Sequence, residues 1–347
     1  MQNISRFISN NLFHHRDLSG YFEPLIQVFK PAWRSGFFRA QVKSIRVLSE
    51  NALKITLKPE KKWPLHIAGQ HISLTIEQHG RLISRVFTIA SGEKKLKQTG
   101  LIDLVIRTHD KGSFTPYLGE LALNSWVNIS NPTGEFSFDE QSNHTTFLAG
   151  GSGITPFIAM LNDLQENTQK HIHLLYYAKP NGHLLVDVLE KLLTRLPNFS
   201  FELLNRSEHG SFTKFVSVEH TDELLVCGPE EMYVEAEKLC KSRQIPIRAE
   251  HFQAIKPTQS INEAARFTVK LNHGDLEVSN QDSLLSEFQS HNEPVMYGCG
   301  MGICHQCQCV KKKGIVRDMR DGRLSDNSEE LIQLCVTQAM TDLELEL

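Results

Sequence analysis

The sequence predicts a multidomain protein: a small antiparallel β-barrel, then an α/β unit with a parallel sheet, then a compact C-terminal unit. Short strand-like runs fill residues 37–142, whereas apolar strands alternate with helical stretches over residues 143–252. Five of the seven cysteines lie in the last 49 residues. A chain of 347 residues has room for two or three domains of ordinary size.

Composition and charge restrict the class of protein. With 40% hydrophobic and 22% charged residues, the chain has a globular composition. Its net charge is −3 and no long Lys/Arg block is present, which argues against nucleic acid as a partner. We find neither a signal-peptide pattern nor an apolar run of about 18 residues, so we expect a cytoplasmic protein that does not span a membrane. There, cysteines serve more often as thiols or metal ligands than as disulfides.

Residues 1–36 form an N-terminal extension that mixes aromatic and polar side chains. Spacing over residues 25–29 suits an amphipathic helix, which Pro31 would end. We expect this helix to pack on its own domain. A surface that faces a partner or a membrane is the alternative.

The next two units differ in their pattern of apolar residues. Runs at 40–45, 71–76 and 101–106 alternate or are apolar and are bounded by turn residues, which is typical of a small antiparallel barrel. Beyond residue 143, helical stretches at 157–164 and 230–240 separate the strands, which favours a parallel sheet with helices on its faces.

The most specific motif is a cysteine loop in the last unit. Cys299, Cys304 and Cys307 are separated by four and then two residues, and Cys335 follows after 27 more. This is the plant-type ferredoxin spacing for a 2Fe–2S cluster. Intervening glycines let the backbone curl closely around the inorganic sulfides and direct N–H groups at them.

Two alternative roles for these cysteines, a zinc site and a redox pair, fit the sequence less well. A four-cysteine zinc site usually has two Cys-x-x-Cys knuckles, and here only one is present. A redox Cys-x-x-Cys motif would leave Cys299 and Cys335 without a role. Cys309 is left over, and we expect it to be a packed or spare thiol.

A glycine-rich turn follows an apolar strand and opens a helix in the α/β unit. Glycines there let a pyrophosphate approach the backbone, and the helix N-terminus offers free N–H groups and a positive dipole end. A second turn closes a later strand, and ligands in open α/β sheets gather at such strand ends. The residues concerned are Gly150, Gly151, Gly153, Thr155 and Pro156 in the first turn and Cys227, Gly228 and Pro229 in the second.

Together these motifs resemble the ferredoxin–NADP reductase superfamily, in particular its members with a fused C-terminal ferredoxin domain. The resemblance covers about residues 37–347. It implies an FAD-binding barrel at 37–142 and a nicotinamide-binding domain at 143–252. A link at 253–265 would then lead to a β-grasp-like α+β ferredoxin domain at 266–347.

Two motifs of the barrel are similar to the family's flavin motifs. Arg85-Val86-Phe87-Thr88 resembles Arg-x-Tyr-Ser, which implies that Arg85 pairs with a flavin phosphate and Phe87 packs on the isoalloxazine. Thr88 would hydrogen-bond near N5, whereas Phe in place of Tyr lacks the hydroxyl for a ribityl hydrogen bond. A second segment resembles Gly-x-x-Ser/Thr-x-x-Leu, which implies FAD rather than FMN. It begins Gly112-Ser113-Phe114-Thr115.

The resemblance also implies roles at the nicotinamide site. Cys227 would lie near the nicotinamide ring and, with Thr88, form the catalytic pair; a buried small hydrophobe is the alternative for this cysteine. Arg206 and Lys214 are similar to residues that meet a 2′-phosphate, which favours NADPH, with NADH possible. The segment Glu250-His251-Phe252 resembles the acidic–aromatic end of the reductase module, without indicating which residue meets the flavin.

These similarities imply an NAD(P)H-dependent oxidoreductase. FAD would take a hydride and pass electrons singly to a 2Fe–2S cluster on the four spaced cysteines, and from there to a protein acceptor. A membrane-bound di-iron fatty acyl desaturase is the preferred acceptor, which would bring peripheral membrane contact. A Rieske-type ring-hydroxylating oxygenase is the alternative acceptor. A non-enzymatic redox sensor or electron-storage module is the alternative class.

Overall fold

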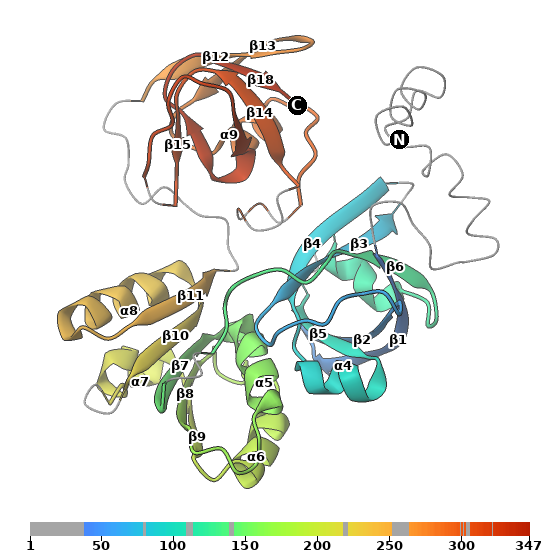
Figure 1. The fold of residues 1–347 in the computed structure, drawn as a ribbon, viewed down its shortest axis with the longest axis vertical. Coiled ribbons are helices and arrows are strands. Elements are labelled where there is room, and N and C mark those ends of the chain that lie inside the picture. Colours follow the sequence, from blue (N-terminus) through green and yellow to red (C-terminus); the bar gives the residue numbers. More distant parts are fainter. Residues whose placement is uncertain are drawn as a thin grey trace.

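The computed structural model describes residues 38–78, 81–108, 114–138, 142–217, 221–251, 264–298, 300, 302, 306–320 and 322–347. Within them the chain forms three units in sequence order, coloured blue to cyan, green to gold, and orange to red in Figure 1. The N-terminal extension at 1–36, with its expected helix, lies outside the described residues. So does most of the expected link at 253–265.

The first unit is a six-stranded antiparallel sheet in the order β4-β3-β6-β1-β2-β5. An antiparallel bridge joins Ile89, directly after β4, to Leu104 in β5, so the two edge strands meet and the sheet closes. Apolar side chains such as Ile55 and Leu74 fill its interior. The elements are β1 (Phe38–Ser49), β2 (Ala52–Pro59), β3 (His71–Gln78), β4 (Arg81–Thr88), α4 (Glu93–Thr99), β5 (Ile102–Arg107), η1 (Thr115–Glu120) and β6 (Trp126–Ile129).

The second unit is a five-stranded parallel sheet in the order β11-β10-β7-β8-β9. The chain runs outward from β7 to β9, then returns to place β10 on the other side of β7. This reversal between β7 and β10 is a topological switch point, where open α/β sheets bind ligands. Its elements are β7 (His144–Gly150), η2 (Gly151–Gly153), α5 (Ile154–Asp163), β8 (His171–Tyr177), α6 (Val186–Arg195), β9 (Phe199–Leu204), α7 (Arg206–His209), η3 (Phe212–Lys214), β10 (Glu223–Gly228), α8 (Glu230–Arg243) and β11 (Ile247–His251).

The third unit is a mixed sheet in the order β13-β12-β18-β14-β16, beside a two-stranded sheet of β15 and β17. Strands β12 and β18 are parallel and their other neighbours antiparallel. Helix α9 contributes Leu284 and Phe288 to the core. The elements are β12 (Arg266–Leu271), β13 (Gly274–Ser279), α9 (Leu284–Ser290), β14 (Gln308–Lys313), β15 (Val316–Asp318), β16 (Glu330–Gln333), η5 (Leu334–Val336), β17 (Thr337–Ala339) and β18 (Leu343–Glu346).

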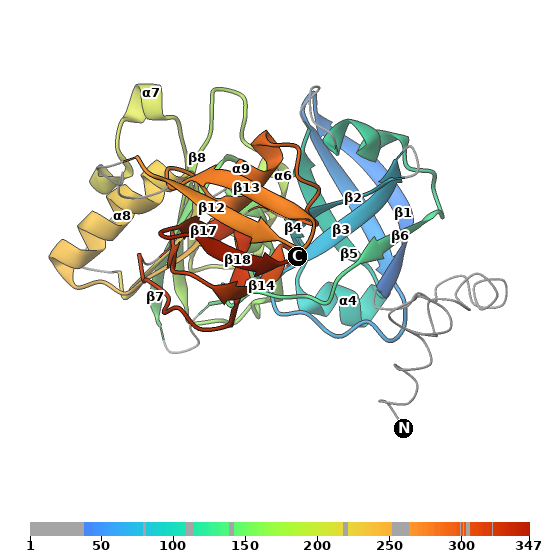
Figure 2. The same ribbon diagram turned by 90° about the horizontal axis from the view of Figure 1, so that it is seen from above.

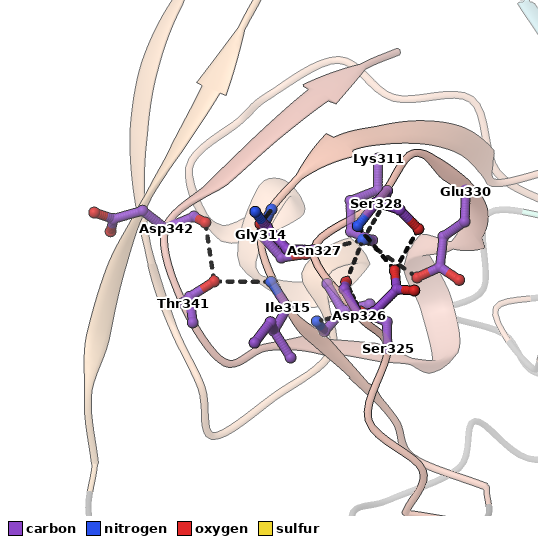
Figure 3. Close-up of polar contacts among 11 residues, drawn as sticks. Lys311, Gly314, Ile315, Ser325, Asp326, Asn327, Ser328, Glu330, Thr341 and Asp342 are labelled. Carbon is purple, nitrogen blue, oxygen red and sulfur yellow. Dashed lines mark hydrogen bonds and ion pairs between the residues drawn. The ribbon is translucent and has the colours of Figure 1, made fainter.

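A buried lysine clamps one loop of this third unit. Nζ of Lys311, fully buried in β14, donates to the carbonyl oxygens of Gly314, Asp326 and Ser328 at 2.9, 2.8 and 2.7 Å (Figure 3). Glu330 Oε1 lies 3.3 Å from the same nitrogen. Three carbonyls match the three donors of an ammonium group, which offsets the cost of burying it. The clamp therefore fixes the loop between β15 and β16, just before Cys335.

Candidate functional site

Strand β4 carries the flavin-motif residues on its two faces. Arg85 and Phe87 share one face because side chains alternate along a strand, and Thr88 points to the other face. The Phe87 ring packs on Phe114, with 5.6 Å between centroids. Phe114 is buried and Thr115 begins η1, whereas Gly112 and Ser113 lie outside the described residues.

Thr88 ends β4 with a buried hydroxyl. Its side chain is 4% exposed, and within the described part of the chain its Oγ1 has no hydrogen-bond partner. An orphaned buried hydroxyl costs about 1–3 kcal/mol. A bound group with a heteroatom at this point would supply the missing partner, so the residues fit a flavin.

Next to Thr88, the barrel and the α/β unit are joined by a buried hydrogen bond. His71 is the cross-strand partner of Thr88, and its Nδ1 lies 3.1 Å from Oε1 of Glu250 in β11. His71 Nε2 lies 3.1 Å from the Thr133 hydroxyl. Both the His71 and Glu250 side chains are buried. Sequence reasoning missed His71 entirely and left open which residue of the 250–252 segment matters; the structure brings Glu250 to the site.

Cys227 lies beside Glu250, as its register partner in the adjacent parallel strand. Burial raises the pKa of the Cys227 thiol well above its ordinary value, and the negative charge of Glu250 raises it further. The thiol is therefore neutral at physiological pH and is no nucleophile. A row of Thr88, His71, Glu250 and Cys227 thus crosses the junction between the barrel and the α/β unit.

The two predicted nucleotide turns pack directly against each other. A Cβ atom on Gly153 would lie 2.0 Å from the carbonyl oxygen of Cys227, and one on Gly150 would lie 2.6 Å from Cδ of Pro229. Gly151 has φ +57° and opens the turn into α5. Close packing of the turns therefore requires glycine at 150 and 153, a constraint separate from the approach of a pyrophosphate.

Other residues brace the first turn. Tyr176 donates its hydroxyl to the carbonyl oxygen of Gly151 at 3.0 Å and accepts the Leu184 N–H at 2.8 Å. Thr155 donates its hydroxyl to the Ser152 carbonyl at 3.0 Å. Pro156 is the third residue of α5 and lies in its first turn. The turn is thus held in shape before any ligand arrives.

At the far end of the sheet, Arg206 begins α7 and meets an acidic residue that sequence reasoning missed. Its Nη2 lies 3.0 Å from Oε2 of Glu235 in α8, and Ser211 donates its hydroxyl to the other oxygen of the same carboxylate.

Two further side chains lie near this pair. Burial raises the pKa of Tyr177 to about 12, helped by the charge of Glu235. The Tyr177 hydroxyl is buried and has no hydrogen-bond partner among the described residues. Lys214 ends η3 close by, with Nζ 3.7 Å from where a Cβ on Gly210 would lie.

Two of the four spaced cysteines converge inside the third unit. The buried Sγ atoms of Cys307 and Cys335 are 3.1 Å apart, longer than the roughly 2.05 Å of a disulfide. The Gly302 N–H donates to Cys335 Sγ at 3.1 Å. Cys299 and Cys304 lie outside the described residues. Among residues that are described, no group of three or more His, Cys, Asp or Glu side chains is placed to hold a metal.

Backbone geometry of the cysteine loop explains its glycines. Gly300 and Gly302 have φ of +68° and +76°, and a Cβ on Gly302 would lie 2.7 Å from the Val336 side chain. Cys309 is buried in β14, and burial raises its pKa to about 12. Converging thiols with an amide N–H aimed at sulfur suit an iron–sulfur cluster.

Comparison with known proteins identifies the family. Residues 39–138 match the oxidoreductase FAD-binding domain, and residues 147–238 match the oxidoreductase NAD-binding domain. The chain belongs to the ferredoxin–NADP reductase superfamily. This superfamily member is an NAD(P)H-dependent oxidoreductase, as the sequence predicted.

Three similar proteins extend the comparison. The toluate 1,2-dioxygenase electron transfer component of Pseudomonas putida is 29% identical over 213 residues, which are 57% of this chain and 61% of that protein. An NADPH oxidoreductase of Mycobacterium tuberculosis is 22% identical over 334 residues, 93% of this chain and 87% of that protein. A solved structure of phthalate dioxygenase reductase superposes with a TM-score of 0.59 at 20% identity, covering 90% of this chain and 98% of that one. No helix in the described part of this reductase is long and apolar enough to cross a membrane.

Proposed function

We propose that this chain is the reductase component of an oxygenase and carries electrons from NAD(P)H through FAD and a 2Fe–2S cluster. The observation that carries the proposal is the pair of buried, converging thiols of Cys307 and Cys335, with the Gly302 N–H aimed at sulfur. This pair lies on a chain that also has both nucleotide-binding domains. FAD, when bound, accepts a hydride from the nicotinamide and releases electrons one at a time.

Residues of the barrel would bind and orient the flavin. Arg85 pairs with a phosphate, Phe87 packs on the ring system, and the Thr88 hydroxyl gains the hydrogen-bond partner that it otherwise lacks. We propose FAD rather than FMN, with the segment Gly112-Ser113-Phe114-Thr115 around the pyrophosphate. The buried contact between His71 and Glu250 keeps bulk water from this junction.

Residues of the α/β unit would hold the nicotinamide nucleotide. The turn from Gly150 to Gly153, followed by Thr155 and Pro156 in α5, receives the pyrophosphate at the switch point. Gly228 and Pro229 close the opposite turn. Cys227 would pack as a neutral thiol beside the nicotinamide ring, because its raised pKa prevents ionisation.

We propose NADPH as the preferred donor, with NADH as the second substrate. Arg206 and Lys214 are cations at the end of the sheet where a 2′-phosphate would lie, and a relative that covers most of the chain is described as an NADPH oxidoreductase. Glu235 opposes this preference, because it already neutralises Arg206. The preference should therefore be moderate.

The cluster would be held by the thiolates of Cys299, Cys304, Cys307 and Cys335. As acceptor we propose a Rieske-type ring-hydroxylating oxygenase, since two of the similar proteins are described as parts of dioxygenase systems. The sequence alone favoured a fatty acyl desaturase and peripheral membrane contact. The comparisons do not support a desaturase as the acceptor, and they fit the oxygenase better.

An absorbance spectrum followed by anaerobic addition of NADPH and, separately, NADH tests the proposal. We expect overlapping flavin and iron–sulfur bands that bleach with either donor, faster with NADPH. The variant Cys304→Ala should lose the cluster bands and keep flavin bleaching, whereas Cys309→Ala should keep both. Flavin bands without cluster bands in the reconstituted native protein would refute the proposed path.

A further inference from the structure

The segment that leads into the cysteine loop contacts the flavin motif through an aromatic ring. The guanidinium of Arg85 lies over the Tyr297 ring, with Cζ 5.9 Å from the centroid. Tyr297 stands two residues before Cys299 and Arg85 three before Thr88. In Figures 1 and 2, β4 lies on the side of the barrel that faces the C-terminal unit.

From this contact we infer that Tyr297 is a positioning residue, which holds the cluster loop against the flavin barrel through Arg85. The inference rests on the proposed function, because it assumes a cluster on the loop and FAD on the barrel. Tyr297 would thereby keep the C-terminal unit in place for electron transfer from the flavin to the cluster. Neither the family motifs nor the cysteine spacing assigns a role to Tyr297.

Local geometry explains why this ring is the one that reaches the barrel. Val295 packs against the core of the C-terminal unit, and the two residues that follow it turn outward. Met296 is 81% exposed, whereas Tyr297 is only 40% exposed although it is the next residue. Of these two side chains, Tyr297 is the one that lies against Arg85.

The cation–π contact with Tyr297 is compatible with phosphate binding by Arg85. A guanidinium donates its hydrogen bonds in its plane and meets aromatic rings through its face. Arg85 Nη1 donates in this way to the Ser84 carbonyl at 2.8 Å. The same side chain can therefore donate hydrogen bonds to the flavin while its charge lies over the Tyr297 ring.

The electron balance is simple. One hydride from NAD(P)H delivers two electrons, and these leave the flavin one at a time. A cluster on the cysteine loop would accept each electron as one ferric ion becoming ferrous, and the oxygenase would take that electron up. The proton of the reduced flavin is released to solvent, so no other oxidant is required. Tyr297 takes no part in the chemistry and acts only on distance and orientation.

Rapid mixing with NADPH tests the inference in the full-length protein with both cofactors bound. In Tyr297→Ala, flavin bleaching should be unchanged, while cluster bleaching slows by about two- to fivefold, the loss expected for an exposed cation–π contact. Tyr297→Leu, which keeps apolar bulk without the ring, should behave like Tyr297→Ala. Tyr297→Phe should match the native protein, as should the neighbouring control Met296→Ala.

A second readout needs neither cofactor. Phenylglyoxal modifies exposed guanidinium groups, and mass spectrometry reports the rate at Arg85 in protein stripped of flavin and cluster. We expect faster modification of Arg85 in Tyr297→Ala than in the native protein or Met296→Ala. Equal rates in all three would overturn the inference.

The two readouts separate this inference from the proposed function. Native protein without cluster bands would refute the function, while the arginine reactivity would still test the contact. Native protein with normal cluster bleaching, matched by Tyr297→Ala and Tyr297→Leu, would refute the role of Tyr297 and leave the function intact.

Discussion

The paired strands β3 and β4 meet the other two units of the chain in different ways. At the end of β4, beside Thr88, the junction with the α/β unit is buried and hydrogen-bonded through His71 of β3 and Glu250. Further back, Arg85 meets the C-terminal unit through a ring, Tyr297, that is 40% exposed. Hydride transfer requires two reacting rings in close and defined contact, with water excluded. The fixed junction therefore lies where hydride would pass, and the weaker contact lies where single electrons would pass.

Removing His71 should break the fixed junction and give the largest effect. His71→Ala leaves the buried Glu250 carboxylate with one partner fewer, which should lower the free energy of unfolding by about 2 kcal/mol. Thermal and urea unfolding measure this change. The matched control is His273→Ala, which removes a His–Glu pair of 2.8 Å whose histidine is 59% exposed. It should cost about 0.5 kcal/mol or less. Equal losses of unfolding free energy in the two variants would show that the His71–Glu250 contact contributes no more than an exposed pair.

Thr88→Val tests whether the buried Thr88 hydroxyl at the fixed junction is reserved for a bound flavin. Because the hydroxyl has no partner in the described part of the chain, its loss should leave the stability of the flavin-free protein unchanged or slightly higher. Flavin reduction by NADPH should slow by about tenfold, as expected when one hydrogen bond to the reacting group is lost.

Thr56→Val provides the contrast for Thr88. Thr56 donates its hydroxyl to the buried Asp103 carboxylate at 2.8 Å, so its replacement should destabilise the protein without slowing flavin reduction. If Thr88→Val instead destabilised the flavin-free protein as much as Thr56→Val, the hydroxyl would have a structural partner and no reserved site.

Glu235→Gln tests the outer end of the nucleotide site and should give the smallest effect. Neutralising this carboxylate frees the charge of Arg206, so the ratio of kcat/KM for NADPH over NADH should rise by about threefold, as expected for an exposed pair. The control is Glu237→Gln in the same helix, which pairs with Lys241 instead. A ratio that moved equally in both variants would mean that Glu235 does not influence the 2′-phosphate.

Local patterns in the sequence were sufficient for the architecture of the first two units. Apolar alternation predicted the antiparallel strands of the first unit, and strand–helix alternation predicted the parallel sheet of the second. The first glycine turn was predicted from its place between an apolar strand and a helix. The structure adds that Gly151 has a positive φ and that Gly153 packs too closely for a side chain. Each of these features depends on residues close together in the chain.

The contacts that join the units were not predictable in the same way. His71 and Glu250 meet only because two units far apart in the sequence dock. His71 has no local pattern that marks it, and the motif around Glu250 did not indicate that this carboxylate would meet a histidine of the barrel. The pairs Arg206–Glu235 and Arg85–Tyr297 likewise link distant segments. Lys311 lies in a basic run that resembles a solvated face, yet it is fully buried because three carbonyls surround it.

Electrons from NADPH should reach a 2Fe–2S cluster on the cysteine loop. Low-temperature electron paramagnetic resonance tests this most directly, on the full-length protein reconstituted with FAD, iron and sulfide and frozen after anaerobic addition of NADPH. We predict the signal of a reduced 2Fe–2S cluster in the native protein and its loss in Cys304→Ala. A bleached flavin without a cluster signal in the native protein would contradict the account.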